Sequence, residues 1–187
     1  VTTHLPSQLL MKFGGQLSIA AHRCRDGRLI LGGGAHVVAT NLFMNWSSNQ
    51  GLIIESGATL TLAKSVNINK SGSRNYVRVE TGGVFTVSTG ISVSSMTNYF
   101  VIDGGIVTNK YGFNINTCDN YPAGGSYAVV QNGGYLYQAS DLNCSGFIDG
   151  SFSILNGAAV DALQTVTVGN YNTPTNIAVR SRLVVSN

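Results

Sequence analysis

The chain has 187 residues and a formal net charge of +3, and only 10% of its residues are charged, against about 25% in an average soluble domain. It contains 23 glycines but only 3 prolines, and 43% of its residues are hydrophobic. The low and scattered charge argues against a nucleic-acid partner, because such a surface clusters Lys and Arg. The hydrophobic content argues against disorder, and no apolar run is long enough to span a membrane.

Residues 1–28 are the least regular part of the chain. The stretch Leu5–Met11 predicts a short helix with proline in its first turn or an extended lead-in, and Phe13–Ile19 alternates after two glycines. We therefore expect an N-terminal cap that merges into an imperfect first coil over residues 1–28, and a repetitive domain over residues 29–187. The chain begins at Val1, which suits a removed signal sequence or a piece of a longer protein.

The domain over residues 29–187 repeats a unit of three short strands. Its clearest copy is Asn75–Val87, in which Gly82 and Gly83 join two alternating strands. The first strand of the unit is expected at 29–31, 52–55, 77–80, 100–103, 128–131, 153–156 and, as a partial copy, 177–180. The second strand is expected at 36–38, 59–62, 84–87, 106–108, 135–137 and 159–161. The third strand is expected at 42–45, 66–69, 91–94, 113–116, 142–145 and 166–168. The alternation of apolar and polar residues is typical of strands with one buried face.

The period of this unit predicts the architecture. The residues that end the first strands are spaced by 25, 23, 28, 25 and 24 positions: Glu55, Glu80, Asp103, Gln131, Asn156 and Arg180. A repeat of this length, with three strands and no room for a helix, indicates coils stacked in parallel. We predict an all-β protein, a single-stranded parallel β-helix of about six to seven coils, each of 23–28 residues.

The coil pattern resembles a known superfamily. Val-x-Val-x-x-Gly-Gly, followed by a strand that alternates with asparagine, is similar to the right-handed parallel β-helices. Within them it resembles passenger domains of bacterial autotransporters and other adhesins, and the shafts of phage tailspikes, over about residues 29–180. The resemblance implies a right-handed solenoid but no activity, because the fold carries many functions. The catalytic motifs of its polysaccharide lyases and hydrolases have no matching run here.

Aromatic residues recur four positions before the ends of the first strands. Strand alternation places four of them outward on one flank of the coil: Tyr76, Tyr99, Tyr127 and Phe152. Two more, Tyr135 and Tyr137, are expected on the next face and could widen that flank. Stacked aromatic rings beside polar groups suit the binding of sugar rings, so these six residues are the candidate carbohydrate site. A stack that only shields the corner and fixes the register is the alternative.

Three acidic residues share one position of the coil. Glu55, Glu80 and Asp103 are expected to stack outward on successive coils. Such a row could bind a calcium ion or supply a carboxylate pair for glycoside hydrolysis. A solvated edge softened by Arg74 and Arg78 is the alternative, and we assign no catalytic residue.

Two cysteines and one polar face complete the candidates. Cys118 and Cys144 could form a disulfide that holds the long loop at 118–125, if their Cα atoms come within about 7 Å of each other. A buried thiol and a separate loop thiol are the alternative. Asn and Ser occupy the outward positions of the third strands, where ladders of amides stabilise stacked coils.

The sequence therefore favours a secreted or cell-surface module with a structural or adhesive role, which binds polysaccharide along the aromatic flank. One alternative is a polysaccharide-degrading enzyme or tailspike fragment that uses the stacked carboxylates. Another is a self-assembling filament subunit. The expected partners are a polysaccharide or cell-surface glycan and further copies of the chain, joined end to end. No cofactor other than calcium is expected.

Overall fold

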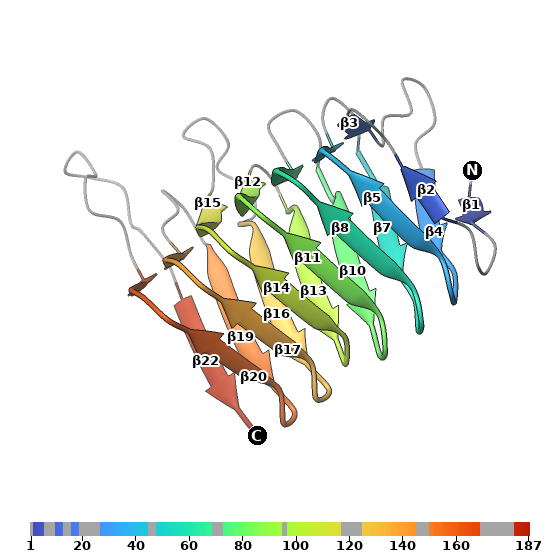
Figure 1. Ribbon diagram of the computed structural model, residues 1–187. Coiled ribbons are helices and arrows are strands. Elements are labelled where there is room, and N and C mark those ends of the chain that lie inside the picture. Colours follow the sequence, from blue (N-terminus) through green and yellow to red (C-terminus); the bar gives the residue numbers. More distant parts are fainter. Residues whose placement is uncertain are drawn as a thin grey trace.

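The chain forms a right-handed parallel β-helix in its computed structural model (Figure 1). The structure describes residues 2–5, 10–12, 16–18, 27–44, 48–68, 73–94, 97–116, 125–144, 150–168 and 182–187. These contain 22 strands in three sheets, which confirms the predicted all-β fold class. No helix in these residues is long and apolar enough for a membrane span.

Neighbouring strands pair in parallel within each sheet. The first sheet contains β1 (Thr2–Leu5), β4 (Gly27–Leu31), β7 (Gln50–Ile54), β10 (Tyr76–Glu80), β13 (Tyr99–Asp103), β16 (Tyr127–Gln131), β19 (Ser151–Leu155) and β22 (Arg182–Ser186). The second contains β2 (Leu10–Lys12), β5 (His36–Ala39), β8 (Thr59–Leu62), β11 (Val84–Val87), β14 (Ile106–Asn109), β17 (Tyr135–Gln138) and β20 (Ala159–Ala162). The third contains β3 (Gln16–Ser18), β6 (Asn41–Met44), β9 (Ser65–Ile68), β12 (Gly90–Ser94), β15 (Phe113–Asn116), β18 (Leu142–Cys144) and β21 (Val166–Val168).

The two ends of the solenoid differ in detail from the expectation. The sheets hold eight, seven and seven strands, so the first sheet has one strand more than the six to seven coils expected. At the N-terminal end, where a cap merging into an imperfect first coil was expected, β1–β3 pair with β4–β6 in the same order as the later coils. The expected last copy at 177–180 lies outside the described residues, and the strand that pairs with β19 is β22.

The alternation predicted for the strands places their apolar residues in one core. In β10, Val77 and Val79 are fully buried, whereas the residues on either side of them point outward. Aromatic rings join the sheets across this core: Phe85 of β11 stacks on Phe100 of β13 at 6.1 Å, and Phe100 meets Phe113 of β15 edge-on at 5.5 Å. Large buried side chains of this kind supply most of the stability of a domain.

Glycines at the corner between the first and second sheets allow the coils to stack closely. Gly82 has a φ of +77°, a conformation that side chains disfavour. Gly83 is required for a different reason, because a Cβ there would lie 2.5 Å from the carbonyl oxygen of Ile54 in the preceding coil. The Gly-Gly corners of the sequence are therefore explained by both backbone conformation and close approach.

A ladder of buried polar side chains lies at the start of the first-sheet strands. Gln50, Asn75, Asn98 and Ser126 are all fully buried. The side-chain oxygen of Asn75 accepts a hydrogen bond from the backbone N–H of Gln50 at 2.9 Å, and Asn98 does the same for Asn75. Each amide thus satisfies a backbone group of the preceding coil, which would be costly to bury alone.

We predict that Gly83→Ala destabilises the protein by about 1–3 kcal/mol, because the added methyl group overpacks a backbone contact. Gly112→Ala is the matched control, since a Cβ at that position meets only the side-chain nitrogen of Asn114 at 3.4 Å. Chemical denaturation of both variants measures the difference. Equal losses of stability would contradict the close-approach explanation.

We predict that Asn75→Leu costs about 1–3 kcal/mol of unfolding free energy, because the buried N–H of Gln50 loses its acceptor. Thermal and chemical denaturation measure the effect. Asn114→Leu, on the outward side of β15, provides the comparison and is expected to change stability by less. A neutral effect of Asn75→Leu would show that the ladder is not a stabilising element.

Candidate binding surface

The outer face of the first sheet carries three columns of side chains, because alternate residues of each strand point outward and paired strands place them in register. We name them by their composition. The tyrosine column is Tyr76, Tyr99 and Tyr127; the middle column is Ile30, Ile53, Arg78, Val101 and Val129; the acid column is Glu55, Glu80 and Asp103. Together these columns form the first-sheet face.

The tyrosine column is a continuous stack. Tyr76 and Tyr99 lie with ring centroids 5.0 Å apart and an interplanar angle of 3°, and Tyr99 and Tyr127 have the same geometry. Because the rings cover each other's faces, the stack presents ring edges and phenol groups to solvent. At its first ring, Tyr76 packs over Gly51, where a Cβ would lie only 2.4 Å from the ring.

The phenols of Tyr99 and Tyr127 stay protonated at neutral pH. Burial raises the pKa of Tyr99, and its neighbours Tyr127 and Tyr76 raise it further, while Arg28 and Arg78 partly offset the effect. Burial also raises the pKa of Tyr127. The column can therefore both donate and accept hydrogen bonds to a ligand along its exposed edge.

The structure corrects the predicted position of Phe152. In β19, Ser151 pairs with Tyr127, so Phe152 pairs with Ala128 and points into the core. Its ring is 1% exposed and meets Phe113 edge-on at 6.1 Å. The cause is register: Val130 pairs with Ile154, so the next unit is one residue shorter than the spacing suggested.

Tyr135 and Tyr137 lie on another sheet, at the outer side of β17 in the second sheet. The acid column and the corner separate them from the tyrosine column, so they do not widen it. The hydroxyl of Tyr135 donates a hydrogen bond to Asp161 in the next coil, which raises the pKa of Tyr135. Their part in binding stays a prediction, but they do not belong to the first-sheet face.

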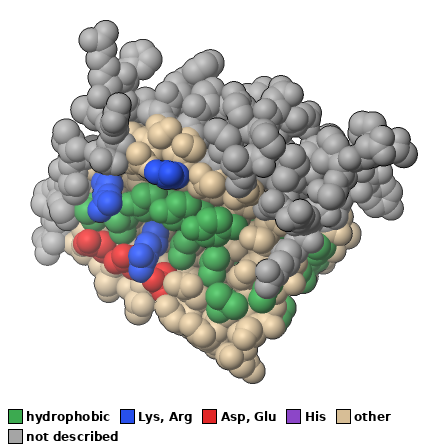
Figure 2. Space-filling view, turned by 180° about the vertical axis from the view of Figure 1, so that it is seen from behind, with side chains coloured by type: hydrophobic (Ala, Val, Ile, Leu, Met, Phe, Trp, Pro, Cys, Tyr) green, Lys and Arg blue, Asp and Glu red, His purple; other side chains and the backbone are tan. Residues whose placement is uncertain are grey.

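The middle column makes the face apolar along most of its length. Ile53, Val101 and Val129 are half-buried although they point outward. Figure 2 shows hydrophobic side chains forming a band across this side of the molecule, with a row of acidic side chains along its edge. This column was not predicted, although the apolar outward residues of β13 and β16, Val101 and Val129, are visible in the sequence.

Arg78 interrupts the apolar band and neutralises part of the acid column. Its guanidinium group forms ion pairs with Glu80, at 3.4 Å, and with Asp103 of the next coil. Asp103 also accepts a hydrogen bond from the amide of Asn132 at 2.6 Å. Burial alone would raise the pKa of Asp103, but hydrogen bonds from Asn132 and Gln131 and the charge of Arg78 hold it below its ordinary value.

A short corner creates a recess beside these charges. Only Gly104 and Gly105 separate β13 from β14, whereas three residues separate the equivalent strands β10 and β11. The recess is lined by residues of four coils: Glu55, Ser56, Arg78, Glu80, Thr81, Asp103 and Asn132. The missing corner residue is visible in the sequence, because Asp103 is followed directly by two glycines.

Two features of the structure bear on the calcium-binding or catalytic role predicted for the acid column. Within the described residues, no group of three His, Cys, Asp or Glu side chains lies close enough to hold a metal ion, and Arg78 competes for two of the three carboxylates. Asp103 is held ionised, which does not suit a general acid in glycoside hydrolysis. A role of the acid column in calcium binding or catalysis therefore stays a prediction.

The predicted disulfide remains a prediction. Cys144 is fully buried in the core on β18, as its inward position suggested. Cys118 lies outside the described residues.

Comparison with known proteins finds no matching family model, no matching curated protein and no matching solved structure. The function therefore has to be argued from the surfaces of the solenoid.

We predict that Asp103→Asn lowers stability by about 1 kcal/mol near neutral pH, the upper range for a partly exposed ion pair. Because the pKa of Asp103 is depressed in the folded state, its contribution is present above the unfolded pKa of about 4 and is lost as the pH falls through the folded value. Unfolding curves of wild type and variant should therefore converge in acid. A stability difference that is independent of pH would contradict this assignment.

Proposed function

We propose that the protein is a secreted or surface-attached β-helix with a structural and adhesive role, which binds polysaccharide along the first-sheet face. The observation that carries this proposal is the tyrosine stack that runs beside an apolar band over successive coils. A band of outward-facing apolar side chains is typical of an interaction site.

The shape of the face favours a long ligand. Its columns continue from coil to coil at the inter-strand spacing of about 4.8 Å, so similar contacts repeat along the axis. A polysaccharide repeats its own chemistry along its length and can use such a series of contacts, whereas a small molecule needs an enclosing pocket.

The chemistry of the face also suits sugars. The middle column and the ring edges of the tyrosine column can contact the C–H surfaces of a sugar ring. Phenol groups on one side, and Glu80 and Arg78 on the other, can hydrogen-bond its hydroxyl groups. In this scheme the acid column, which contains Glu55 and Glu80, forms the polar border of the apolar band.

We predict that Tyr127→Ala and Val129→Asp each weaken polysaccharide retention about tenfold or more, because each removes an apolar contact of the face worth roughly 1.4 kcal/mol. Affinity electrophoresis in gels that contain neutral or charged polysaccharides measures retention. Tyr127 is preferred to Tyr99 because it loses one stacking partner rather than two, so its cost in stability is smaller.

Tyr137→Ala is the matched control, since Tyr137 is an outward tyrosine of the second sheet and should retain full binding. Thermal unfolding of all three variants separates lost binding from lost folding. Retention that is unchanged in both face variants, or absent in the wild type on every polysaccharide of the panel, would refute the proposal.

A further inference from the structure

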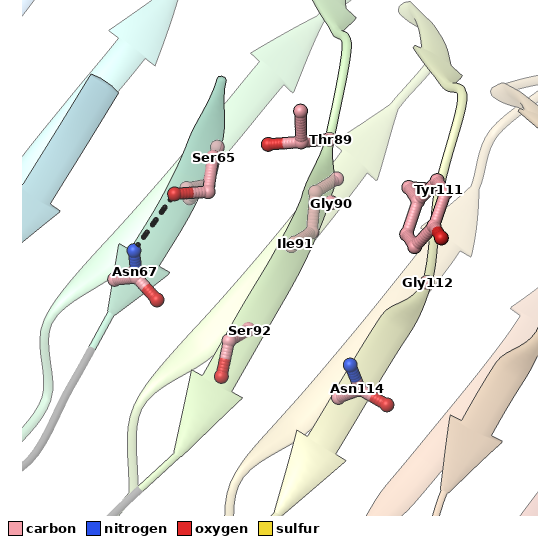
Figure 3. Close-up of a pocket in the computed structure, with 10 residues that line it drawn as sticks. Ser65, Asn67, Thr89, Gly90, Ile91, Ser92, Tyr111, Gly112 and Asn114 are labelled. Carbon is pink, nitrogen blue, oxygen red and sulfur yellow. Dashed lines mark hydrogen bonds between the residues drawn. The ribbon is translucent and has the colours of Figure 1, made fainter.

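A groove lies on the outer face of the third sheet, on a different sheet from the first-sheet face. It is centred on Gly90 of β12 and Gly112 just before β15, which lie side by side in adjacent coils: the N–H of Ile91 donates to the carbonyl of Gly112 at 3.0 Å. Ser65 occupies the equivalent position one coil earlier. The two missing side chains leave a trough between β9 and β15 (Figure 3).

Packing requires glycine at position 90 but not at position 112. Gly90 has a φ of +140°, and a Cβ there would lie 2.8 Å from the carbonyl oxygen of Gly112, so the packing requires glycine. Gly112 has room for a side chain, because a Cβ would meet only the amide nitrogen of Asn114 at 3.4 Å. Close packing therefore does not require glycine at position 112, whereas keeping the groove open does.

The walls of the groove carry uncharged polar groups with unused hydrogen-bonding capacity. On one side, the amide nitrogen of Asn67 donates to the hydroxyl of Ser65 at 3.0 Å, which leaves the side-chain oxygen of Asn67 for a ligand. On the other side, Asn114 accepts from Asn143 at 3.0 Å and keeps its own amide nitrogen. Figure 3 shows Ser92 on the floor between these walls.

An exposed aromatic ring stands at the rim of the groove. Tyr111 is 65% exposed, but its backbone is held firmly from inside. The buried amide of Asn109 donates to the carbonyl oxygen of Tyr111 at 2.8 Å, and the buried amide of Gln138 donates to the same oxygen. A ring presented on a fixed backbone loses little freedom when a ligand binds.

These features together point to the ligand class. None of the residues that line the groove is Asp, Glu, Lys, Arg or His, so the groove offers nothing to neutralise an ionic ligand. Hydroxyls and amides that both donate and accept, beside one exposed ring, match a ligand that has hydroxyl groups and an apolar ring face. We propose that this groove binds a single neutral sugar unit, stacked on Tyr111 and hydrogen-bonded by Asn67, Ser92 and Asn114.

This inference does not depend on the proposed function, because the two surfaces share no residue. The probes are three neutral oligosaccharides, the hexamers of β-1,4-linked glucose, mannose and xylose, titrated into isotope-labelled protein. We expect the amide signals of Gly90 and Gly112 to shift with at least one probe. Tyr111→Ala should weaken this binding about tenfold, as expected for loss of one aromatic contact.

Gly112→Val fills the groove and should abolish the shifts at Gly90, while Tyr111→Phe keeps the ring and should retain most of the binding. Tyr137→Ala and Tyr127→Ala, both outside the groove, should leave it unchanged. The absence of shifts at Gly90 and Gly112 with all three probes would overturn the inference, and so would shifts that persist in Gly112→Val. Equal shifts from a glycine-serine peptide of similar length would overturn the assignment to sugars.

If Tyr127→Ala abolishes retention in the gels but the groove shows no shifts, the proposed function stands and this inference fails. If the groove binds oligosaccharide but Tyr127→Ala and Val129→Asp retain polysaccharide fully, the inference stands and the proposed first-sheet site fails. The two experiments are therefore separable.

Discussion

Parallel pairing of each coil with the next is the constraint on which the rest of this structure depends. The hydrogen bonds of three parallel sheets fix the register of every strand, so a residue at one position of a coil lies about 4.8 Å from the residue at the same position in the next. Any property that recurs in the sequence then becomes a column in space. Inside, this yields the apolar core and the buried amides that begin with Gln50 and Asn75. Outside, it yields the tyrosine stack and the acid column.

Columns of this kind are predictable only where the repeat keeps its length. The strands from 29 to 144, the inward Val79 and Phe85, and the stacking of Tyr76, Tyr99 and Tyr127 could all be read from the sequence, because period-two alternation and a near-constant spacing agree there. Phe152 could not, because a one-residue change in register reverses the side of the sheet that a side chain faces. The position of Phe152 between two serines was the local signal that the spacing overrode.

Other features depend on three-dimensional contacts that a linear pattern does not contain. The ion pairs of Arg78 join two coils, and the recess beside Asp103 arises from one residue missing at a corner. The groove at Gly90 and Gly112 arises from side chains that are absent, so composition gives no sign of it. The recess and the groove are both interruptions of an otherwise regular array.

The tyrosine stack has a mechanical consequence. Its three rings belong to three successive coils, so a polymer held along the stack would spread its load over three strands instead of pulling on a single coil. Force applied along the axis would instead load the inter-coil hydrogen bonds in series, and the weakest coil would open first, because each coil contacts only its neighbours. An attachment that contacts several coils therefore avoids placing the whole load on the interface between two of them.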